Sequence, residues 1–139
     1  MRSQLTNRLL TVAVVASIAI LTGCAPDPKV SRDDVIGTWT LEEGGQVVFD
    51  DETVRFENLY VSPLSGTGSD AEFQGSGTWE LEGKSSIAFV LPEWSGRLGR
   101  SIAGRAEGGT LKAVQKSGRV QITIFDPDKE IGYFLKKDR

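Results

Sequence analysis

The chain has 139 residues and a formal net charge of −3, with 39% hydrophobic and 25% charged residues. This length and composition fit one globular domain and exclude a collagen-like, disordered or multi-span membrane protein. The sequence contains no histidine, which excludes Ser-His-Asp and Cys-His catalysis and histidine-ligated zinc or haem. A single cysteine excludes an internal disulfide and a cysteine-rich metal site.

Residues 1–23 have the organisation of a signal peptide. Arg2 and Arg8 flank the start, and an apolar run of 13 residues follows at 9–21 (LLTVAVVASIAIL). A membrane-spanning helix needs roughly 20 apolar residues, so this run is too short to be one. The run ends in Leu21, Thr22, Gly23 and Cys24.

These four residues resemble the lipobox of bacterial lipoproteins. The resemblance implies that the Cys24 thiol receives a diacylglyceryl group and that a lipoprotein signal peptidase then cleaves before it. Attachment through two acyl chains such as palmitate is lasting, whereas one chain gives only marginal binding. The protein is therefore expected on the extracytoplasmic face of the cell membrane. The alternatives are a plain secretory signal with an accidental cysteine, or an uncleaved anchor.

The mature chain would then begin at Cys24. Without Arg2 and Arg8 it has 14 basic and 19 acidic residues, a net charge of −5, which argues against a nucleic-acid partner. Residues 24–33 contain two prolines and are expected to form a short tether, extended at about 3.1 Å per residue. The folded domain is expected over 34–139.

An all-β domain is predicted for this remaining segment. Ser31 can cap a single helical turn, after which apolar and polar residues alternate, as at Val120, Ile122 and Ile124. Turn residues separate the apolar stretches, and the pattern predicts an antiparallel meander of about eight strands, closed into a barrel or folded into a sandwich. The run at 87–91 is apolar on both faces. It is expected to be the most buried strand or to be covered by a loop.

Two segments interrupt the alternation. Residues 65–77 (SGTGSDAEFQGSG) are rich in glycine and serine and are predicted to form a mobile loop. Residues 92–104 (PEWSGRLGRSIAG) place Trp94, Leu98 and Ile102 four residues apart, which predicts a lid helix or a bent connection. The Gly-Thr-Trp sequence of 37–39 recurs at 77–79, as an internal duplication or as convergent hairpin chemistry.

Gly37 and Trp39, at the start of the first expected strand, resemble the Gly-x-Trp signature of lipocalin-like proteins. The resemblance implies a barrel whose closed end Trp39 plugs, with a basic side chain of the last strand over it (Lys136, Lys137 or Arg139). The wider pattern resembles a group of small bacterial lipoproteins with a second Gly-x-Trp strand and an Asp-Pro-Asp turn. Other lipocalin motifs are not evident in the sequence.

An eight-stranded barrel is just wide enough to be filled by side chains or to hold one small ligand. By analogy with the fold, the leading hypothesis is a non-catalytic binding module for a small apolar or amphipathic molecule. Trp79, Phe89 and Tyr133 are the possible lining residues. The alternative is an envelope protein with a filled core that binds another protein through its loops.

The remaining polar clusters favour structural interpretations. The carboxylates at 126, 128 and 130 and those at 50–52 fit turns better than calcium sites. Three arginines near Trp94, at 97, 100 and 105, could touch anionic lipids, but a packed Trp94 with a polar arginine face is favoured. The serines have no imidazole base and no Ser-x-x-Lys pair. No enzyme activity, metal or cofactor is expected.

Overall fold

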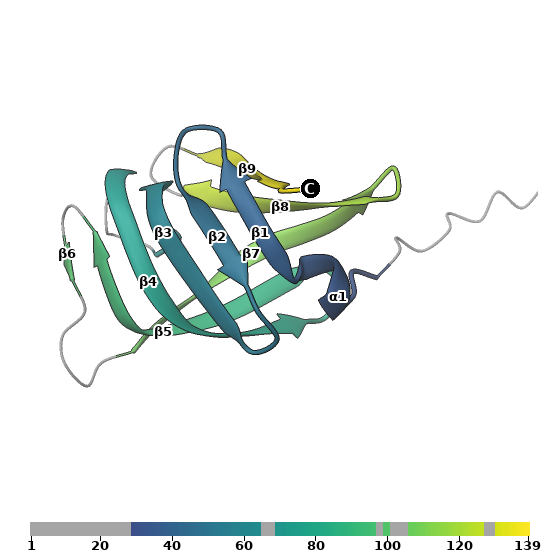
Figure 1. Ribbon diagram of the computed structural model, residues 1–139, viewed down its shortest axis with the longest axis horizontal. Helices are drawn as coiled ribbons and strands as arrows, with labels where there is room; N and C mark the ends of the chain where they lie inside the picture. The colour runs from purple at the N-terminus through teal and green to yellow at the C-terminus, as the bar shows by residue number, and fades with distance from the viewer. Residues whose placement is uncertain (1–28, 65–68, 97–98, 101–105, 127–129) are drawn as a thin grey trace, which may run out of the picture.

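A computed structural model of the chain describes residues 29–64, 69–96, 99–100, 106–126 and 130–139 (Figure 1). The expected signal peptide, the lipobox residues Leu21, Thr22 and Gly23, and Cys24 lie outside the described residues. Over the described ranges, no helix combines the length and the apolar character that crossing a bilayer requires.

The described chain enters the domain through a single helical turn, α1 (Arg32–Val35). As predicted, Ser31 caps it: its hydroxyl accepts from the Asp34 backbone N–H at 3.4 Å. The Asp34 carboxylate in turn accepts from the Ser31 hydroxyl at 2.6 Å and from its backbone N–H at 2.9 Å. Val30, a residue of the predicted 24–33 tether, is buried in the core, so the end of that segment packs against the barrel.

Antiparallel strands make up the rest of the described domain. Their bounds are β1 (Gly37–Leu41), β2 (Gln46–Phe49), β3 (Thr53–Val61), β4 (Ser69–Glu82), β5 (Ser86–Gly96), β6 (Gly99–Arg100), β7 (Glu107–Lys116), β8 (Arg119–Asp126) and β9 (Ile131–Lys137).

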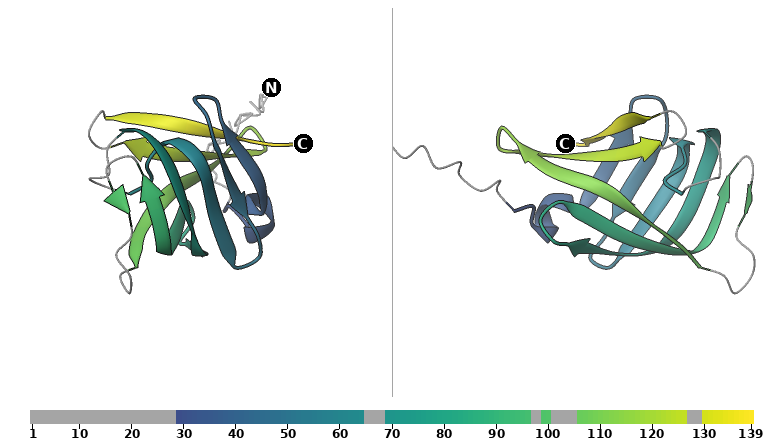
Figure 2. Two further views of the ribbon diagram at one scale, coloured as in Figure 1. Left: turned by 60° about the vertical axis from the view of Figure 1, so that its left-hand side comes forward. Right: turned by 180° about the vertical axis from the view of Figure 1, so that it is seen from behind.

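The strands form one closed barrel (Figures 1 and 2). The order in the sheet is β4-β3-β2-β1-β9-β8-β7-β5, and β4 pairs with β5 to complete the circle. The short strand β6 pairs only with the end of β5. Among the described residues the barrel therefore has the all-β meander of eight strands that the sequence predicted, and it is a barrel rather than a sandwich.

The barrel closes through its first and last strands. Trp39 of β1 lies opposite Lys137 of β9, and Leu41 lies opposite Leu135. Beyond the end of β9, the backbone N–H of Asp138 donates to the carbonyl of Thr38 at 2.9 Å. This seam brings the basic C-terminal residues beside α1, where the described chain begins.

Alternate side chains of each strand fill the interior, as the period of two requires. Aromatic rings contact one another across it: Phe56 lies 5.8 Å from Phe73 and 5.1 Å from Phe89 between ring centroids. Phe49 meets Trp79 edge-on at 5.2 Å. The core is thus a packed aromatic and aliphatic cluster.

The expectation of a loop over 65–77 was wrong for residues 69–77, which belong to β4; positions 65–68 lie outside the described residues. Gly75 pairs with Phe56 on one side and with Trp94 on the other. A Cβ atom on Gly77 would lie only 1.8 Å from the carbonyl oxygen of Val90. The glycines here allow close strand packing, so their abundance did not indicate a loop.

The expected lid helix also fails where it can be seen. Residues 92–96 continue β5, and the Trp94 ring stacks on Phe73 with centroids 6.1 Å apart. The side chains of Leu98 and Ile102 lie outside the described part. The run at 87–91 is not buried on both faces, because Val90 is 47% exposed while Phe89 is buried.

Candidate functional site

The three residues expected to line a ligand cavity lie in the core. Trp79 packs edge-on against Phe49, and its indole N–H donates to the carbonyl of Asp50 at 2.8 Å. Phe89, which lies opposite Trp79 in the β4–β5 pair, packs against Phe56. Tyr133 is buried on β9. Trp79 and Phe89 are therefore neighbours, and both are held by core contacts.

A shallow hollow of about 400 Å³ lies beside Trp79 and Phe89. Arg32 of α1 contributes to its wall, and its guanidinium carbon lies 4.4 Å from the centroid of the Trp79 ring. This cation–π contact covers the indole from the α1 side. Tyr133 does not line this hollow, so the structure does not join the three expected residues into one site.

Trp39 is 1% exposed, and its indole N–H donates to the carbonyl of Val35 in α1 at 2.8 Å. The Lys137 ammonium lies 5.5 Å from the centroid of the Trp39 ring and donates to the carbonyl of Asp34 at 2.9 Å. Of the basic residues considered for this place, Lys137 is the one that occupies it. Gly37 has a φ of +133°, and a Cβ atom there would approach the Lys137 side chain at 2.9 Å. The glycine therefore leaves space for the lysine.

A hollow with a volume of about 810 Å³ opens at this same end. We call it the basic groove. Its walls are α1, the turn between β7 and β8, and the end of β9, which Figure 2 shows at one end of the barrel. Its charged lining residues are Asp33, Asp34, Lys116, Arg119, Lys136, Lys137 and Arg139, and its apolar ones are Trp39, Val120 and Leu135.

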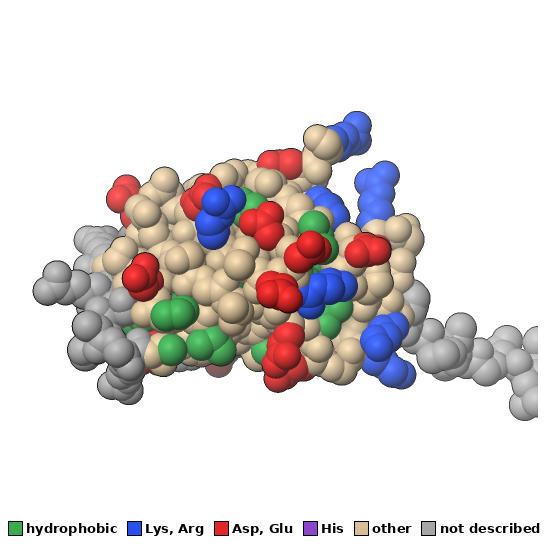
Figure 3. All heavy atoms as spheres, turned by 60° about the horizontal axis from the view of Figure 1, so that its bottom comes forward, with side chains coloured by type: hydrophobic (Ala, Val, Ile, Leu, Met, Phe, Trp, Pro, Cys, Tyr) green, Lys and Arg blue, Asp and Glu red, His purple; other side chains and the backbone are tan. Residues whose placement is uncertain are grey.

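Positive charge therefore exceeds negative charge in the basic groove. Figure 3 shows most of the visible Lys and Arg side chains towards the same end of the molecule, with Asp and Glu spread over the whole visible face. Lys136 forms an ion pair with Glu42 at 3.0 Å, and Lys137 is held by its contacts with Asp34 and Trp39. Within the described residues, Lys116, Arg119 and Arg139 form no ion pair.

The acidic side of the groove is fixed by α1. Hydrogen bonds from the Ser31 hydroxyl and backbone N–H hold the pKa of Asp34 below its ordinary value, and the nearby charge of Lys137 acts in the same direction. Asp34 is thus ionised at neutral pH, and its hydrogen bonds are satisfied by its own cap. The Asp34 carboxylate therefore stabilises α1 and does not neutralise the charges of Lys116, Arg119 and Arg139.

The sequence alone did not indicate this groove. Lys116 and Arg119 flank one turn, while Lys136, Lys137 and Arg139 end the chain's last strand. Antiparallel pairing of β8 with β9 places the start of one beside the end of the other. A predicted hairpin of these two strands places the two basic clusters side by side at its open end. This was the signal that could have indicated the groove.

The cluster around Trp94 lies elsewhere. Trp94 belongs to the part of β5 that leads to β6, at the end of the barrel opposite α1 (Figure 1). It is partly buried and stacked on Phe73, as the packed interpretation requires. Arg97, Arg105 and the side chain of Arg100 lie outside the described residues.

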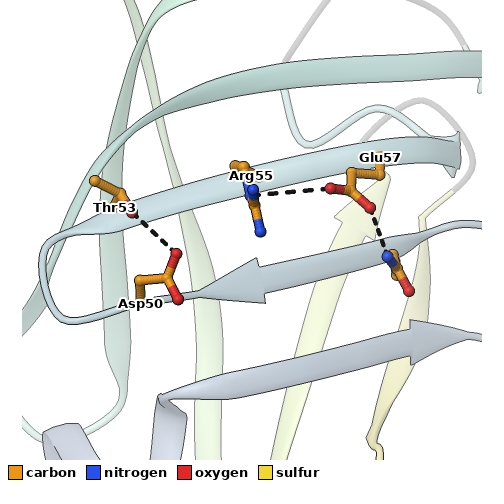
Figure 4. Close-up of polar contacts among 5 residues, drawn as sticks. Asp50, Thr53, Arg55 and Glu57 are labelled. Atoms are coloured by element: carbon orange, nitrogen blue, oxygen red, sulfur yellow. Dashed lines mark hydrogen bonds and ion pairs between the residues drawn. The ribbon is translucent and has the colours of Figure 1, made fainter.

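In the part that the structure describes, the acidic residues of these clusters lie on the surface, except for Asp126. Asp50 accepts a hydrogen bond from Thr53 at 3.4 Å, and Glu57 pairs with Arg55 at 3.9 Å on the outer wall (Figure 4). Asp126 is buried at the end of β8, whereas Asp128 falls outside the described residues. Across the described ranges, no three Asp, Glu, His or Cys side chains gather as metal ligands would.

No family model, curated protein or solved structure matches the chain. The likeness to lipocalin-like proteins therefore still depends on the Gly37 and Trp39 motif, and the closed barrel is established by strand pairing alone. The basic groove is the candidate functional site because it joins unneutralised cations to apolar side chains in one open hollow. Such a lining can bind an amphipathic anion.

Proposed function

We propose that the protein is a membrane-anchored, extracytoplasmic lipoprotein whose barrel is a non-catalytic binding module for a small amphipathic ligand. Acylation of Cys24 is the anchor in this proposal, which the basic, apolar and lipobox-like segments of residues 1–24 support. The observation that carries the binding role is the basic groove at the α1 end of the barrel.

The groove suits a ligand better than the barrel interior does. Trp79 and Phe89 already have aromatic partners inside the core, so a ligand among them would have to displace packed side chains. The groove has a volume of about 810 Å³, which lies in the range of small-molecule sites. Val120 is only partly buried there and offers an apolar contact beside the cations of Lys116 and Arg119.

The groove favours binding over catalysis. Its lining consists of ammonium and guanidinium groups, a serine, a glutamine, two carboxylates and apolar side chains. A general acid needs a pKa near the working pH, whereas that of Asp34 is lowered by its cap. Lys and Arg side chains of this kind attract anions and hold them by charge-assisted hydrogen bonds.

Native mass spectrometry of residues 29–139, which contain every described strand and the whole described core, tests the proposal. The domain is incubated with a lipid extract of a bacterial envelope, and circular dichroism first checks that it is folded. We expect a discrete added mass that a Lys116→Ala, Arg119→Ala variant loses and an Arg55→Ala, Lys112→Ala variant keeps. A bare protein mass, or an adduct that both variants keep, would remove the groove from consideration.

One observation favours binding of another protein as the second candidate. Phe125 is 59% exposed and Phe134 53% exposed, and they lie diagonally across the β8–β9 pair on the outer wall. Exposed aromatic residues are common at protein interfaces. If Phe125→Ser and Phe134→Ser together abolish cross-linking to an envelope protein while ligand adducts are absent, this second function replaces the first.

A further inference from the structure

We propose that the basic groove binds the phosphate groups of anionic phospholipids, and that the barrel rests with this end on the membrane that carries its anchor. The inference rests on the proposed function and names the class of its ligand. Three independent features of the described residues support it: the separation of charge, the place where the chain enters the domain, and the mixed chemistry of the groove.

Charge is separated along the molecule. The chain from Cys24 onward has a net charge of −5, yet the groove contains five basic and two acidic residues. The carboxylates of the turn between β2 and β3, at 50–52, do not line it. An acidic protein is repelled by an anionic bilayer in most orientations. Among the described residues, the groove gathers more basic than acidic side chains, so an orientation that turns it towards the phosphates makes the interaction attractive.

The entry point of the chain places the groove near the bilayer. Val30 is buried in the core, and α1 follows it directly. Val30 lies six positions after Cys24, and even a fully extended chain spans at most about 22 Å over six positions. Because Asp33 and Asp34 of α1 line the groove, an acylated Cys24 keeps the groove within that reach of the membrane surface. The end of the barrel that contains Trp94 then faces away from the bilayer.

The groove has the chemistry that a phospholipid headgroup requires. The forked guanidinium groups of Arg119 and Arg139 can each bind two phosphate oxygens, and Lys116 supplies a point charge. Val120 is partly exposed in the same hollow and can contact the glycerol and the first methylenes, whereas Trp39 and Leu135 are buried. A free inorganic anion would contact only the basic side chains and not the apolar one.

Vesicle sedimentation tests the proposal with the domain of residues 29–139, which has no Cys24 and therefore reports on the groove alone. Vesicles of phosphatidylglycerol and phosphatidylcholine in equal parts are compared with vesicles of phosphatidylcholine. We expect binding to the anionic vesicles only, and weaker binding as salt is added. A Lys116→Ala, Arg119→Ala variant should bind roughly 20-fold more weakly, since each basic residue near such a surface contributes about fivefold.

An Arg55→Ala, Lys112→Ala variant is the matched control, because it loses the same charge from strands on the outer wall of the barrel. Its affinity for the anionic vesicles should fall by less than about threefold relative to the unchanged domain, since screening limits the effect of distant charges. Equal losses in the two variants would mean that net charge alone attracts the domain, and would overturn the groove as the site.

Soluble glycerol phosphate distinguishes the two sources of phosphate. Isothermal titration with it should give no measurable saturation at concentrations where the vesicles bind. Saturable binding of glycerol phosphate, together with no preference for anionic vesicles, would assign the groove to a free phosphate ester and overturn the lipid proposal. The proposed function would survive that result, whereas absence of any adduct in native mass spectrometry would remove both.

Discussion

Replacement of Trp39 tests whether the barrel depends on its plugged end. The indole is almost fully buried, and its N–H donates to the Val35 carbonyl at 2.8 Å. Truncation of a buried tryptophan to alanine costs about 3–5 kcal/mol, and an unpaired carbonyl inside α1 adds to the upper end of that range. A domain of this size has a total stability of about 5–15 kcal/mol. The Trp39→Ala variant is therefore expected to be marginal.

Trp39→Phe separates the hydrogen bond from the packing. It keeps an aromatic ring and leaves the Val35 carbonyl without its donor, which should cost about 1–3 kcal/mol. Trp79→Phe is the matched variant, since Trp79 also donates to a backbone carbonyl, that of Asp50, but in a partly buried place. Water can replace that donor, so the smaller loss is expected there.

Urea unfolding followed by far-ultraviolet circular dichroism measures these losses, because the signal follows mainly the backbone of the strands. The free energy of unfolding is extrapolated linearly to water, and an unchanged slope shows that the unfolded state is unaffected. A loss below about 1 kcal/mol for Trp39→Ala would refute the reasoning. It would mean that Trp39 is not the packed plug of the α1 end.

Three further outcomes are expected. Cys24→Ser should abolish labelling with radioactive palmitate and move the protein out of the membrane fraction; continued labelling would refute the lipobox assignment. Gly77→Ala places a Cβ atom against a β5 carbonyl at 1.8 Å and should cost at least about 2 kcal/mol in urea unfolding, while the neighbouring Ser76→Ala should cost under about 0.5 kcal/mol. Ser31→Ala should destabilise the domain by about 1 kcal/mol at neutral pH and raise the pKa of Asp34 in an NMR titration. Because the folded-state pKa of Asp34 is lowered, its stabilisation is present above the unfolded value of about 4 and is lost as the pH falls through the folded value, so the two proteins should converge in acid.

The sequence predicted the barrel wherever alternation was undisturbed. Strand β8 has apolar residues at every second position, and both its existence and its antiparallel neighbours follow from that pattern. Residues 69–77 were predicted as a loop because glycine and serine are common in loops. In the structure, Gly75 and Gly77 lie where β5 packs closely against β4. Local composition does not carry that tertiary requirement.

The helix expected after Pro92 is wrong for residues 92–96, for a different reason. The spacing of four between Trp94, Leu98 and Ile102 in the sequence fits a period of two as well as a helical period, so it did not distinguish a helix from a strand. The candidate site was harder still. Lys116 and Lys137 are distant in sequence and meet only because β8 and β9 pair, so the groove appears only once the register is known.

The seam between β1 and β9 has a consequence for how the protein is made. Strand β1 pairs with β2 on one side, but its other edge finds a partner only when the last strand, β9, is present. Pairings between such distant segments form slowly, because the entropy of closing the chain is lost before the contacts form. While the chain is made from its amino end, the sheet therefore stays open, with one edge of β1 unpaired until residues 131–137 are present. The topology itself defers closure of the barrel until the last strand of the domain is available.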